Sequence, residues 1–435
     1  MELLYHYLWK HRLLGENIVT VDGREIEVVC PGIHNNDAGP DFSAARIRVD
    51  GQEWCGNVEI HVRASDWIRH GHDRDAAYDS VILHVVGIND SVITDKNGKR
   101  IPQVIATFPE SFVQLYARLS ENINDSACEA LLSALPSLLV TDWLDSLAVE
   151  RMQTKSRRIL DALDYLDGDW ERVCFVVLAR ALGFGLNSDP FEMLGRSVPL
   201  RVMARHSDDI MQLEAVLFGQ AGMLDTSIHI FDEYYQRLCR EYFFLARKYG
   251  LRPLKRDIWK FARTRPQNFP TRRIALLARA LKGGFSLLSR VIDRNCRIEE
   301  MRKCFDWTLD GYWLDHFDFD VPGNHLPAGL SENNIDLLLI NFAAPLIYAY
   351  GAYQGDADTA GRGLDIWSGL EAENNSVIRK WQKAGIRCSC ATDSQALLQL
   401  RREYCDRHRC LECRFGHALL REASGRRLSF HKLVQ

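Results

Sequence analysis

Residues 34–42 read His-Asn-Asn-Asp-Ala-Gly-Pro-Asp-Phe, and residues 57–62 read Asn-Val-Glu-Ile-His-Val. Alternate side chains of a β-strand share a face, so the apolar residues of the second run turn toward a core while Glu59 and His61 turn together to the other side. Asp41 begins the neighbouring segment, from which its carboxylate can approach Glu59 across the ladder. Two such oxygen donors suit Mg²⁺ or Mn²⁺.

The surrounding pattern places these residues in a small α/β arrangement. Helical spacing of apolar residues covers residues 1–15. Asp22-Gly23 and Asp50-Gly51 each separate two short alternating runs, which predicts β-hairpins because both turn positions need positive φ. A short helix starting near Asp66 and a strand over residues 81–86 follow. The predicted order is helix, strands, short helix, strand.

This arrangement resembles the PD-(D/E)XK superfamily, which has a restriction-endonuclease-like fold. The resemblance lies in Pro40-Asp41, a hairpin-length gap, and Glu59 followed after one residue by His61. It implies that Asp41, Glu59 and the carbonyl of Ile60 hold a Mg²⁺ or Mn²⁺ ion, and that His61 stands where the superfamily usually has lysine. A histidine there can accept a proton as general base or bind the metal directly.

Histidines are concentrated in the same region. Seven of the fourteen lie within the first 84 residues: His6, His11, His34, His61, His70, His72 and His84. We take His70, His72 and His84 as secondary site candidates, and Glu2 as a further acidic one; the alternative is that they are solvated loop residues or a hydrogen-bonded sheet histidine.

The chain as a whole also resembles an uncharacterised bacterial family of unknown function. The resemblance lies in Gly-Pro-Asp-Phe at residues 39–42, Gly-Asn-Val-Glu-Ile-His at residues 56–61, and Arg-Cys-Leu-Glu-Cys at residues 409–413.

The remaining sequence predicts an α+β protein with three parts. Residues 1–112 form the nuclease-like α/β core, residues 113–350 a long all-helical domain, and residues 351–435 a linker, a helix and a cysteine cluster. The linker prediction rests on the Gly-, Ala- and Asp-rich residues 351–363. The longest apolar stretch, residues 337–350, is shorter than the ~20 residues that span a bilayer and predicts a buried helix.

A basic stretch interrupts a chain whose net charge is -4. Residues 252–282 contain ten lysines and arginines against one acid, Asp257: Arg252, Lys255, Arg256, Lys260, Arg263, Arg265, Arg272, Arg273, Arg279 and Lys282. This pattern indicates phosphate contacts, with Trp259 as a candidate for base stacking. The alternative is solvated helix faces with core aromatics.

Four of these arginines are the predicted nucleic-acid contacts: Arg263, Arg265, Arg272 and Arg273. Prolines at positions 266 and 270 prevent a continuous helix, so we expect a connecting segment to present them. We also expect the fold to tolerate replacement of Arg265, Arg272 and Arg273 by alanine, because exposed charges add little stability.

Five of the twelve cysteines fall between residues 388 and 413. Cys410 and Cys413 form a Cys-x-x-Cys pair, which together with Cys405 and one of Cys388 or Cys390 offers four soft ligands to Zn²⁺ or an iron–sulfur cluster. The alternative is unligated thiols. Cysteines without a secretory signal indicate a reducing, cytoplasmic location.

The leading functional hypothesis is metal-dependent hydrolysis of phosphodiester bonds in DNA or RNA. The alternative is a nuclease-fold module that binds nucleic acid or protein without catalysis. Nucleic acid is the expected partner and no membrane is expected. The sequence does not distinguish DNA from RNA, or endonuclease from exonuclease action.

Overall fold

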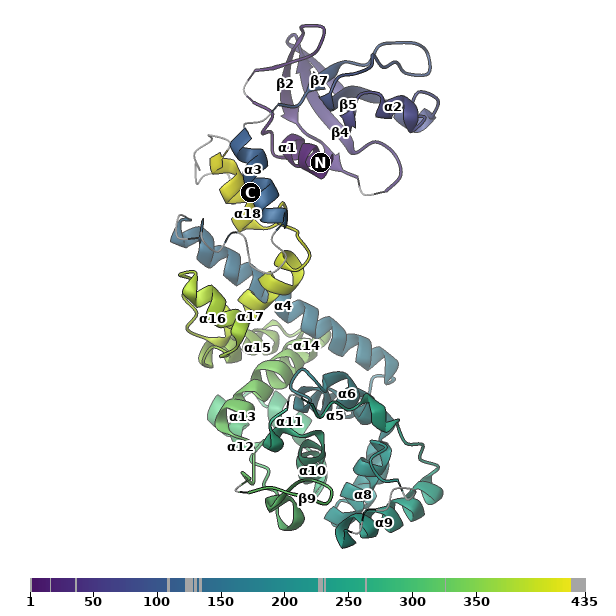
Figure 1. The fold of residues 1–435 in the computed structure, drawn as a ribbon, viewed down its shortest axis with the longest axis vertical. Helices are drawn as coiled ribbons and strands as arrows, with labels where there is room; N and C mark the ends of the chain where they lie inside the picture. The colour runs from purple at the N-terminus through teal and green to yellow at the C-terminus, as the bar shows by residue number, and fades with distance from the viewer. Residues whose placement is uncertain are drawn as a thin grey trace. The chain divides into compact units, whose positions relative to one another are not determined.

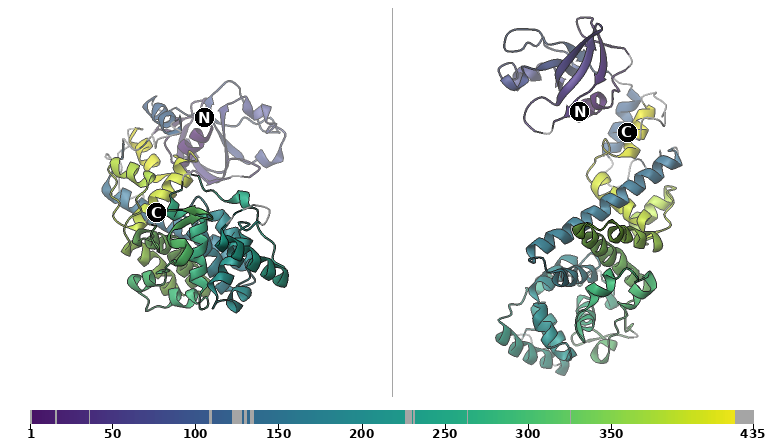
Figure 2. Two further views of the ribbon diagram at one scale, coloured as in Figure 1. Left: turned by 60° about the horizontal axis from the view of Figure 1, so that its bottom comes forward. Right: turned by 180° about the vertical axis from the view of Figure 1, so that it is seen from behind.

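The computed structural model describes residues 2–15, 17–35, 37–107, 110–121, 128, 131–132, 135–225, 230, 232–262, 264–324 and 326–423. The chain forms two compact units. Unit 1 comprises Met1–Trp143, Lys383–Ile386 and Leu400–Gln435, and unit 2 comprises Leu144–Gln382 and Arg387–Gln399. A sheet followed along the chain by a long helical region confirms the predicted α+β class (Figures 1 and 2).

Unit 1 holds one mixed sheet and a few helices. Its elements are α1 Glu2–Lys10, β1 Ile18–Val19, β2 Glu25–Cys30, β3 Ile33–His34, β4 Phe42–Val49, β5 Gln52–Arg63, α2 Asp66–Arg69, η1 Ala76–Tyr78, β6 Val81–Ile88, β7 Gln103–Ile105, α3 Glu110–Glu121, the π-helix η7 Leu400–Cys405 and α18 Arg414–Ala423.

The strands lie in the order β1-β2-β4-β5-β6-β7, and β3 pairs with β4. Pairing is antiparallel from β1 to β5 and parallel from β5 to β7. The β4–β5 hairpin turns at Asp50 and Gly51, which have φ of 50° and 84°, as the Asp-Gly signal predicts. The helix α2 leads from β5 to β6, which makes their parallel pairing sterically accessible.

The two faces of β5 have different surroundings. Val58 and Ile60 are fully buried in a core that α1 covers. Glu59 and His61 point to the other face, toward α2 and the loop that follows it, where Trp67 belongs to a second, smaller cluster. The period of two along β5 therefore separates the apolar core from the polar candidates, as predicted.

Gly56 allows the close approach of β5 and β6 that these candidates need. A Cβ atom at this position would lie 2.6 Å from the carbonyl oxygen of Ser80 and 2.4 Å from Cγ2 of Ile82. The absence of a side chain therefore permits the pairing that places His61 beside His84.

The end of the described chain packs back onto the beginning of unit 1. Helix α18 lies beside α3, as Figure 1 and the rear view of Figure 2 show. Tyr7 of α1 and His417 of α18 are joined by a 2.6 Å hydrogen bond between Oη and Nδ1, and Leu420 is fully buried in the core of α1. Residues 410 apart in sequence thus share one core.

Unit 2 is built almost entirely of helices. Its elements are most of α4 Ser137–Tyr165, α5 Trp170–Leu182, α6 Ser188–Ser197, α7 Leu200–Arg205, α8 Ile210–Gln220, α9 Glu233–Tyr249, η3 Arg256–Ile258, η4 Pro266–Asn268, α10 Pro270–Leu281, α11 Leu287–Ile292, α12 Ile298–Lys303, η5 Gly311–Leu314, β8 His316–Asp318, β9 Val321–Pro322, α13 Glu332–Leu338, the π-helix η6 Leu339–Ala343, α14 Ala344–Gln354, α15 Ala357–Gly369, α16 Ser376–Lys383 and α17 Ala391–Gln399.

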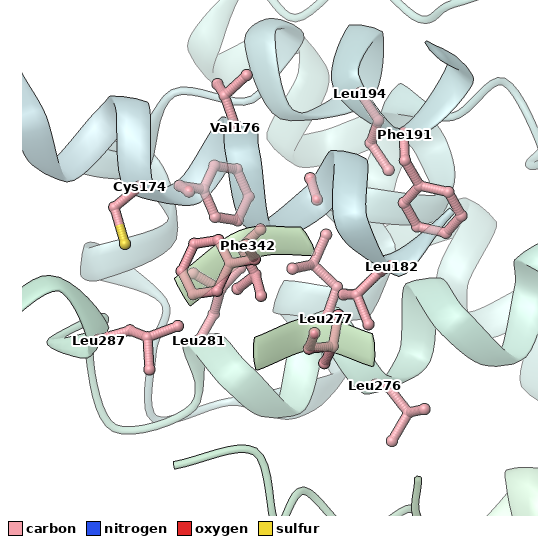
Figure 3. Close-up of a cluster of buried hydrophobic side chains, with 14 of the residues drawn as sticks. Cys174, Val176, Leu182, Phe191, Leu194, Leu276, Leu277, Leu281, Leu287 and Phe342 are labelled. Carbon is pink, nitrogen blue, oxygen red and sulfur yellow. The ribbon is translucent and has the colours of Figure 1, made fainter. Parts of the chain in front are cut away.

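Helices α5 and α10 lie at the centre of this unit. Figure 3 shows Leu182 of α5 near Leu277 of α10, and Phe342 of η6 among the same side chains. All three are at most 1% exposed. The core of unit 2 is therefore formed by segments that are far apart in sequence.

Residues 351–363 are helical, where the sequence suggests a linker. They form the end of α14 and the first half of α15, with a turn at Gly355. The glycines bring the two helices together, because a Cβ atom at Gly351 would lie 2.3 Å from the amide nitrogen of Ala360, and one at Gly363 would lie 2.7 Å from the carbonyl oxygen of Ala344. Small residues that suggest a flexible segment serve here for close helix packing.

The apolar stretch at residues 337–350 lies in a continuous run of helix from Glu332 to Gln354. By length and composition this run is long and apolar enough to cross a membrane, but 61% of its most apolar 18 residues is buried inside the protein. That burial matches the predicted core helix and a soluble protein. A cytoplasmic location stays a prediction.

Candidate metal centre

Asp41 and Glu59 lie opposite each other at the end of the β4–β5 ladder. Phe42 pairs with Val58, so the register continued by one residue places Asp41 across from Glu59. The amide of Asp41 donates to Oε2 of Glu59 at 3.0 Å, and the amide of Ile60 donates to Oδ2 of Asp41 at 2.8 Å. The two carboxylates are therefore held together by the backbone, and Asp41 approaches Glu59 across the ladder as expected.

Three histidines, His61, His70 and His72, converge beside this pair. Oε1 of Glu59 lies 3.5 Å from Nε2 of His61 and 3.4 Å from Nε2 of His72. One ring nitrogen from each of His61, His70 and His72 lies within 4.8 Å of the other two. A tetrahedral ion with bonds of ~2.1 Å separates its ligand atoms by roughly 3.4 Å, which is close to the distances from Oε1 of Glu59 to His61 and to His72.

His84 on β6 contacts the ring nitrogen of His61 that does not face Glu59. It is completely buried, and its Nε2 lies 2.8 Å from Nδ1 of His61. His61 thus contacts Glu59 through one ring nitrogen and His84 through the other. A metal-binding histidine typically has such a partner at its second nitrogen, because that contact fixes the tautomer and the orientation of the ring.

One histidine outside our predicted set reaches the site, and a second contacts that histidine. Nε2 of His6 on α1 lies 3.4 Å from Oδ2 of Asp41, and Nδ1 of His6 lies 3.3 Å from Nε2 of His34 on β3. His6 follows the predicted candidate Glu2 by four residues, one turn of α1, so this helical spacing is the signal that could have identified it. Glu2 is exposed, and its charge contributes to the raised pKa of Glu59.

Burial shifts the pKa values of these groups toward their neutral forms. Desolvation, followed by the negative charge of Asp41, raises the pKa of Glu59 to about 9. Desolvation lowers the pKa of His61 to about 4, and it also lowers the pKa values of His72 and His84. Neutral imidazoles are the form that binds a metal, whereas Glu59 must lose a proton to do so.

Two of the arginines that were predicted to be exposed are buried in the structure. Arg272 and Arg273 are each 2% exposed and belong to α10, which begins at Pro270. Proline is well tolerated in the first turn of a helix, so Pro270 starts the helix that it was expected to prevent. Arg265 is exposed at the start of η4, as predicted, and Arg263 lies outside the described residues.

Trp259 has the environment of a core residue. It is 5% exposed, its Nε1 donates to the carbonyl of Ala221 at 2.8 Å, and its ring meets Phe191 edge to face. Base stacking needs an exposed ring face, so the packing favours the alternative that this aromatic belongs to the core.

The C-terminal thiols gather in unit 1 around a small cavity of about 20 Å³. Cys405, Cys410 and Cys413 line it together with Cys128, while Cys388 and Cys390 belong to the last part of unit 2. Burial raises the pKa of Cys410 to about 11 and also raises that of Cys413. Within the described ranges, no three of these sulfurs meet the 4.8 Å spacing of the histidines, so a metal here stays a prediction.

Unit 1 thus presents a mixed sheet carrying a buried cluster of carboxylates and imidazoles. A family model described as "Protein of unknown function (DUF2851)" matches residues 2–376, and the chain belongs to this family. The match ends before the cysteine-bearing segment. Comparison with curated proteins and with solved structures found no match.

Proposed function

We propose that unit 1 is a divalent-metal-dependent phosphodiesterase that hydrolyses DNA or RNA. The observation that carries this proposal is the meeting of Asp41, Glu59 and His61 with His70 and His72 at one place on the sheet. Acidic and histidine ligands side by side are what a hydrolytic metal centre requires.

The order of elements in unit 1 supports the restriction-endonuclease-like assignment. Helix α1 precedes the antiparallel strands β2, β4 and β5, and α2 then leads to β6, which is parallel to β5. With the two-residue strands β1 and β3 left aside, this is the αβββαβ order of the PD-(D/E)XK superfamily, with Glu59 on β5 and Asp41 immediately before β4. Fold order alone does not establish an activity, so the proposal rests on the side chains.

The donor set favours Mn²⁺ or Zn²⁺ over Mg²⁺. Imidazole nitrogens suit transition metals, whereas Mg²⁺ prefers oxygen ligands. Glu59, His61 and His72 are the ligands that we propose, with His70 as the fourth. We assign His61 as a ligand and not as the general base. Its two ring nitrogens already face Glu59 and His84, so neither is free to take a proton from water.

When bound, a divalent ion at this position lowers the pKa of a water molecule and neutralises charge on the phosphate. The water oxygen forms a bond to phosphorus, and the bond from phosphorus to the departing sugar oxygen breaks. We assign His6 to accept the proton of that water, because its Nε2 lies 3.4 Å from Oδ2 of Asp41, whose negative charge stabilises a protonated imidazole. The departing oxygen takes up a proton from solvent and leaves as a hydroxyl.

Incubation of the purified full chain with end-labelled single-stranded and duplex DNA and RNA tests the proposal. We expect cleavage with Mn²⁺ or Zn²⁺ and none with EDTA. Tight metal binding without cleavage of any substrate would overturn the phosphodiesterase assignment and favour the alternative, a binding module that keeps the fold.

We expect His84→Leu to weaken metal binding about 10- to 100-fold, the usual effect of removing the partner of a metal-binding histidine. Leucine fills the buried space but offers nothing to Nδ1 of His61. His84→Gln is the matched control, since its amide can keep a hydrogen bond there. Calorimetric titration with Mn²⁺ measures both, and equal affinity in His84→Leu and wild type would contradict the supporting role.

A further inference from the structure

Unit 2 contains a cavity of about 540 Å³, which is within the range of small-molecule sites. It lies between the end of α5, the start of α6, the segment around η4, the first turn of α10 and residues 327–334. Three arginines line it, Arg265, Arg272 and Arg273, together with several amides and a serine. No aspartate or glutamate is among its described lining residues.

Arg273 is a buried cation without a counter-ion in the described chain. Its Nη2 donates to Oδ1 of Asn268 at 2.6 Å, and its guanidinium lies 4.1 Å from the ring centre of Phe184. Nε and Nη1 are buried and have no hydrogen-bond partner. Burial lowers the pKa of Arg273 to about 9, with the neighbouring Arg272 as a second cause. Proteins rarely leave such a group unpaired, because a desolvated charge is unfavourable.

Arg272 adds a second positive charge beside it. Its guanidinium donates to the backbone carbonyls of Trp313, His316 and Pro327, which satisfy hydrogen bonds without neutralising charge. Two adjacent cations without an acid create a local excess of positive charge. A doubly charged anion balances that charge better than a single carboxylate does. The guanidinium groups also suit phosphate geometry.

The rest of the lining is suited to an organic group. Leu182, Leu186, Phe191 and Leu330 provide apolar surface, while Asn187 and Asn334 provide polar groups that can orient a ligand. We propose that this cavity binds a small organic phosphate monoester, with its phosphate at Arg273 and its carbon skeleton against the leucines. The site is separate from the candidate metal centre and does not depend on nuclease activity.

Thermal unfolding and calorimetry of the full chain test this site with ribose 5-phosphate, adenosine 5′-monophosphate, inorganic phosphate and adenosine. We expect both monoesters to bind and to raise the unfolding temperature with concentration. Inorganic phosphate should bind at least tenfold more weakly, and adenosine should have no effect. Equal affinity for inorganic phosphate would show that the cavity binds a simple anion and would overturn the organic ligand. No response to any phosphate at concentrations on the order of 1 mM would overturn the site itself.

Arg273→Met is the decisive variant. It removes the charge with little change in volume, and replacing a buried charge by an apolar residue is often neutral or stabilising. We expect it to fold and to lose the response to both monoesters by at least tenfold. Arg252→Ala, an exposed arginine of the same unit, should bind like wild type. The same affinity in Arg273→Met and wild type would refute the proposal.

Discussion

Glu59→Gln is expected to reduce metal-dependent cleavage by more than the 10- to 100-fold typical of outer-shell changes, because it removes a proposed direct ligand. Oε1 of Glu59 faces Nε2 of both His61 and His72. An amide has the size of the carboxyl group but no negative charge, so it is a poor ligand for a divalent ion. Cleavage of labelled nucleic acid and calorimetric Mn²⁺ titration measure the effect.

Loss of activity in this variant will not reflect unfolding. The raised pKa means that Glu59 is largely protonated at pH 7 without metal, and glutamine resembles that neutral form. Glutamine can also accept the amide hydrogen of Asp41 as Oε2 does. We therefore expect the free energy of unfolding of the metal-free protein to change by no more than about 0.5 kcal/mol.

Glu27→Gln is the matched control. Glu27 is an exposed acid on β2 of the same sheet, and it pairs with Arg48 at 2.7 Å. Its replacement should leave cleavage and Mn²⁺ affinity unchanged. If Glu59→Gln cleaves as fast as Glu27→Gln, then Glu59 is not a ligand and the metal centre must be placed elsewhere.

The approach of Asp41 to Glu59 could be predicted only in part from local rules. Strand periodicity fixes the face on which Glu59 and His61 lie, and the Asp50-Gly51 turn fixes the register of β4 on β5 as far as Ala45. A shift of one residue between Ala45 and Phe42 then places Asp41 across from Glu59 instead of Ile60, and no turn signal specifies that shift. The approach of His72 to Glu59 depends instead on how the loop after α2 folds over the sheet. No spacing in the sequence specifies that contact, and enrichment in histidine could only suggest it.

Where burial decides the role of a residue, sequence patterns were less informative. Arg272 and Arg273 resemble surface residues because charged side chains are seldom fully buried. The buried guanidinium of Arg272 depends on carbonyl groups more than 40 residues away, at Trp313, His316 and Pro327. In the same way, Cys128 joins the C-terminal thiols through tertiary packing alone, with no nearby cysteine to indicate it.

The burial of Arg272 reverses the expectation that alanine is tolerated there. We expect Arg272→Ala to lower the free energy of unfolding by roughly 2 kcal/mol or more, because the buried carbonyl of Trp313 left without a donor costs about 1–3 kcal/mol. The carbonyls of His316 and Pro327, which are only partly buried, lose their donor as well. Urea denaturation monitored by tryptophan fluorescence measures the change, with Trp313 itself close to the altered site.

Two neighbouring arginines provide the controls, because their surroundings differ. Arg265 is exposed, so Arg265→Ala should change stability by no more than about 0.5 kcal/mol. Arg273→Met removes an unpaired buried charge and should be neutral or stabilising. The three substitutions, at arginines within nine residues of each other, are thus expected to change the free energy of unfolding by different amounts and with different signs. If Arg272→Ala unfolds at the same urea concentration as Arg265→Ala, the carbonyl contacts of Arg272 do not stabilise unit 2, and the segment from Trp313 to Pro327 must be held by its apolar packing.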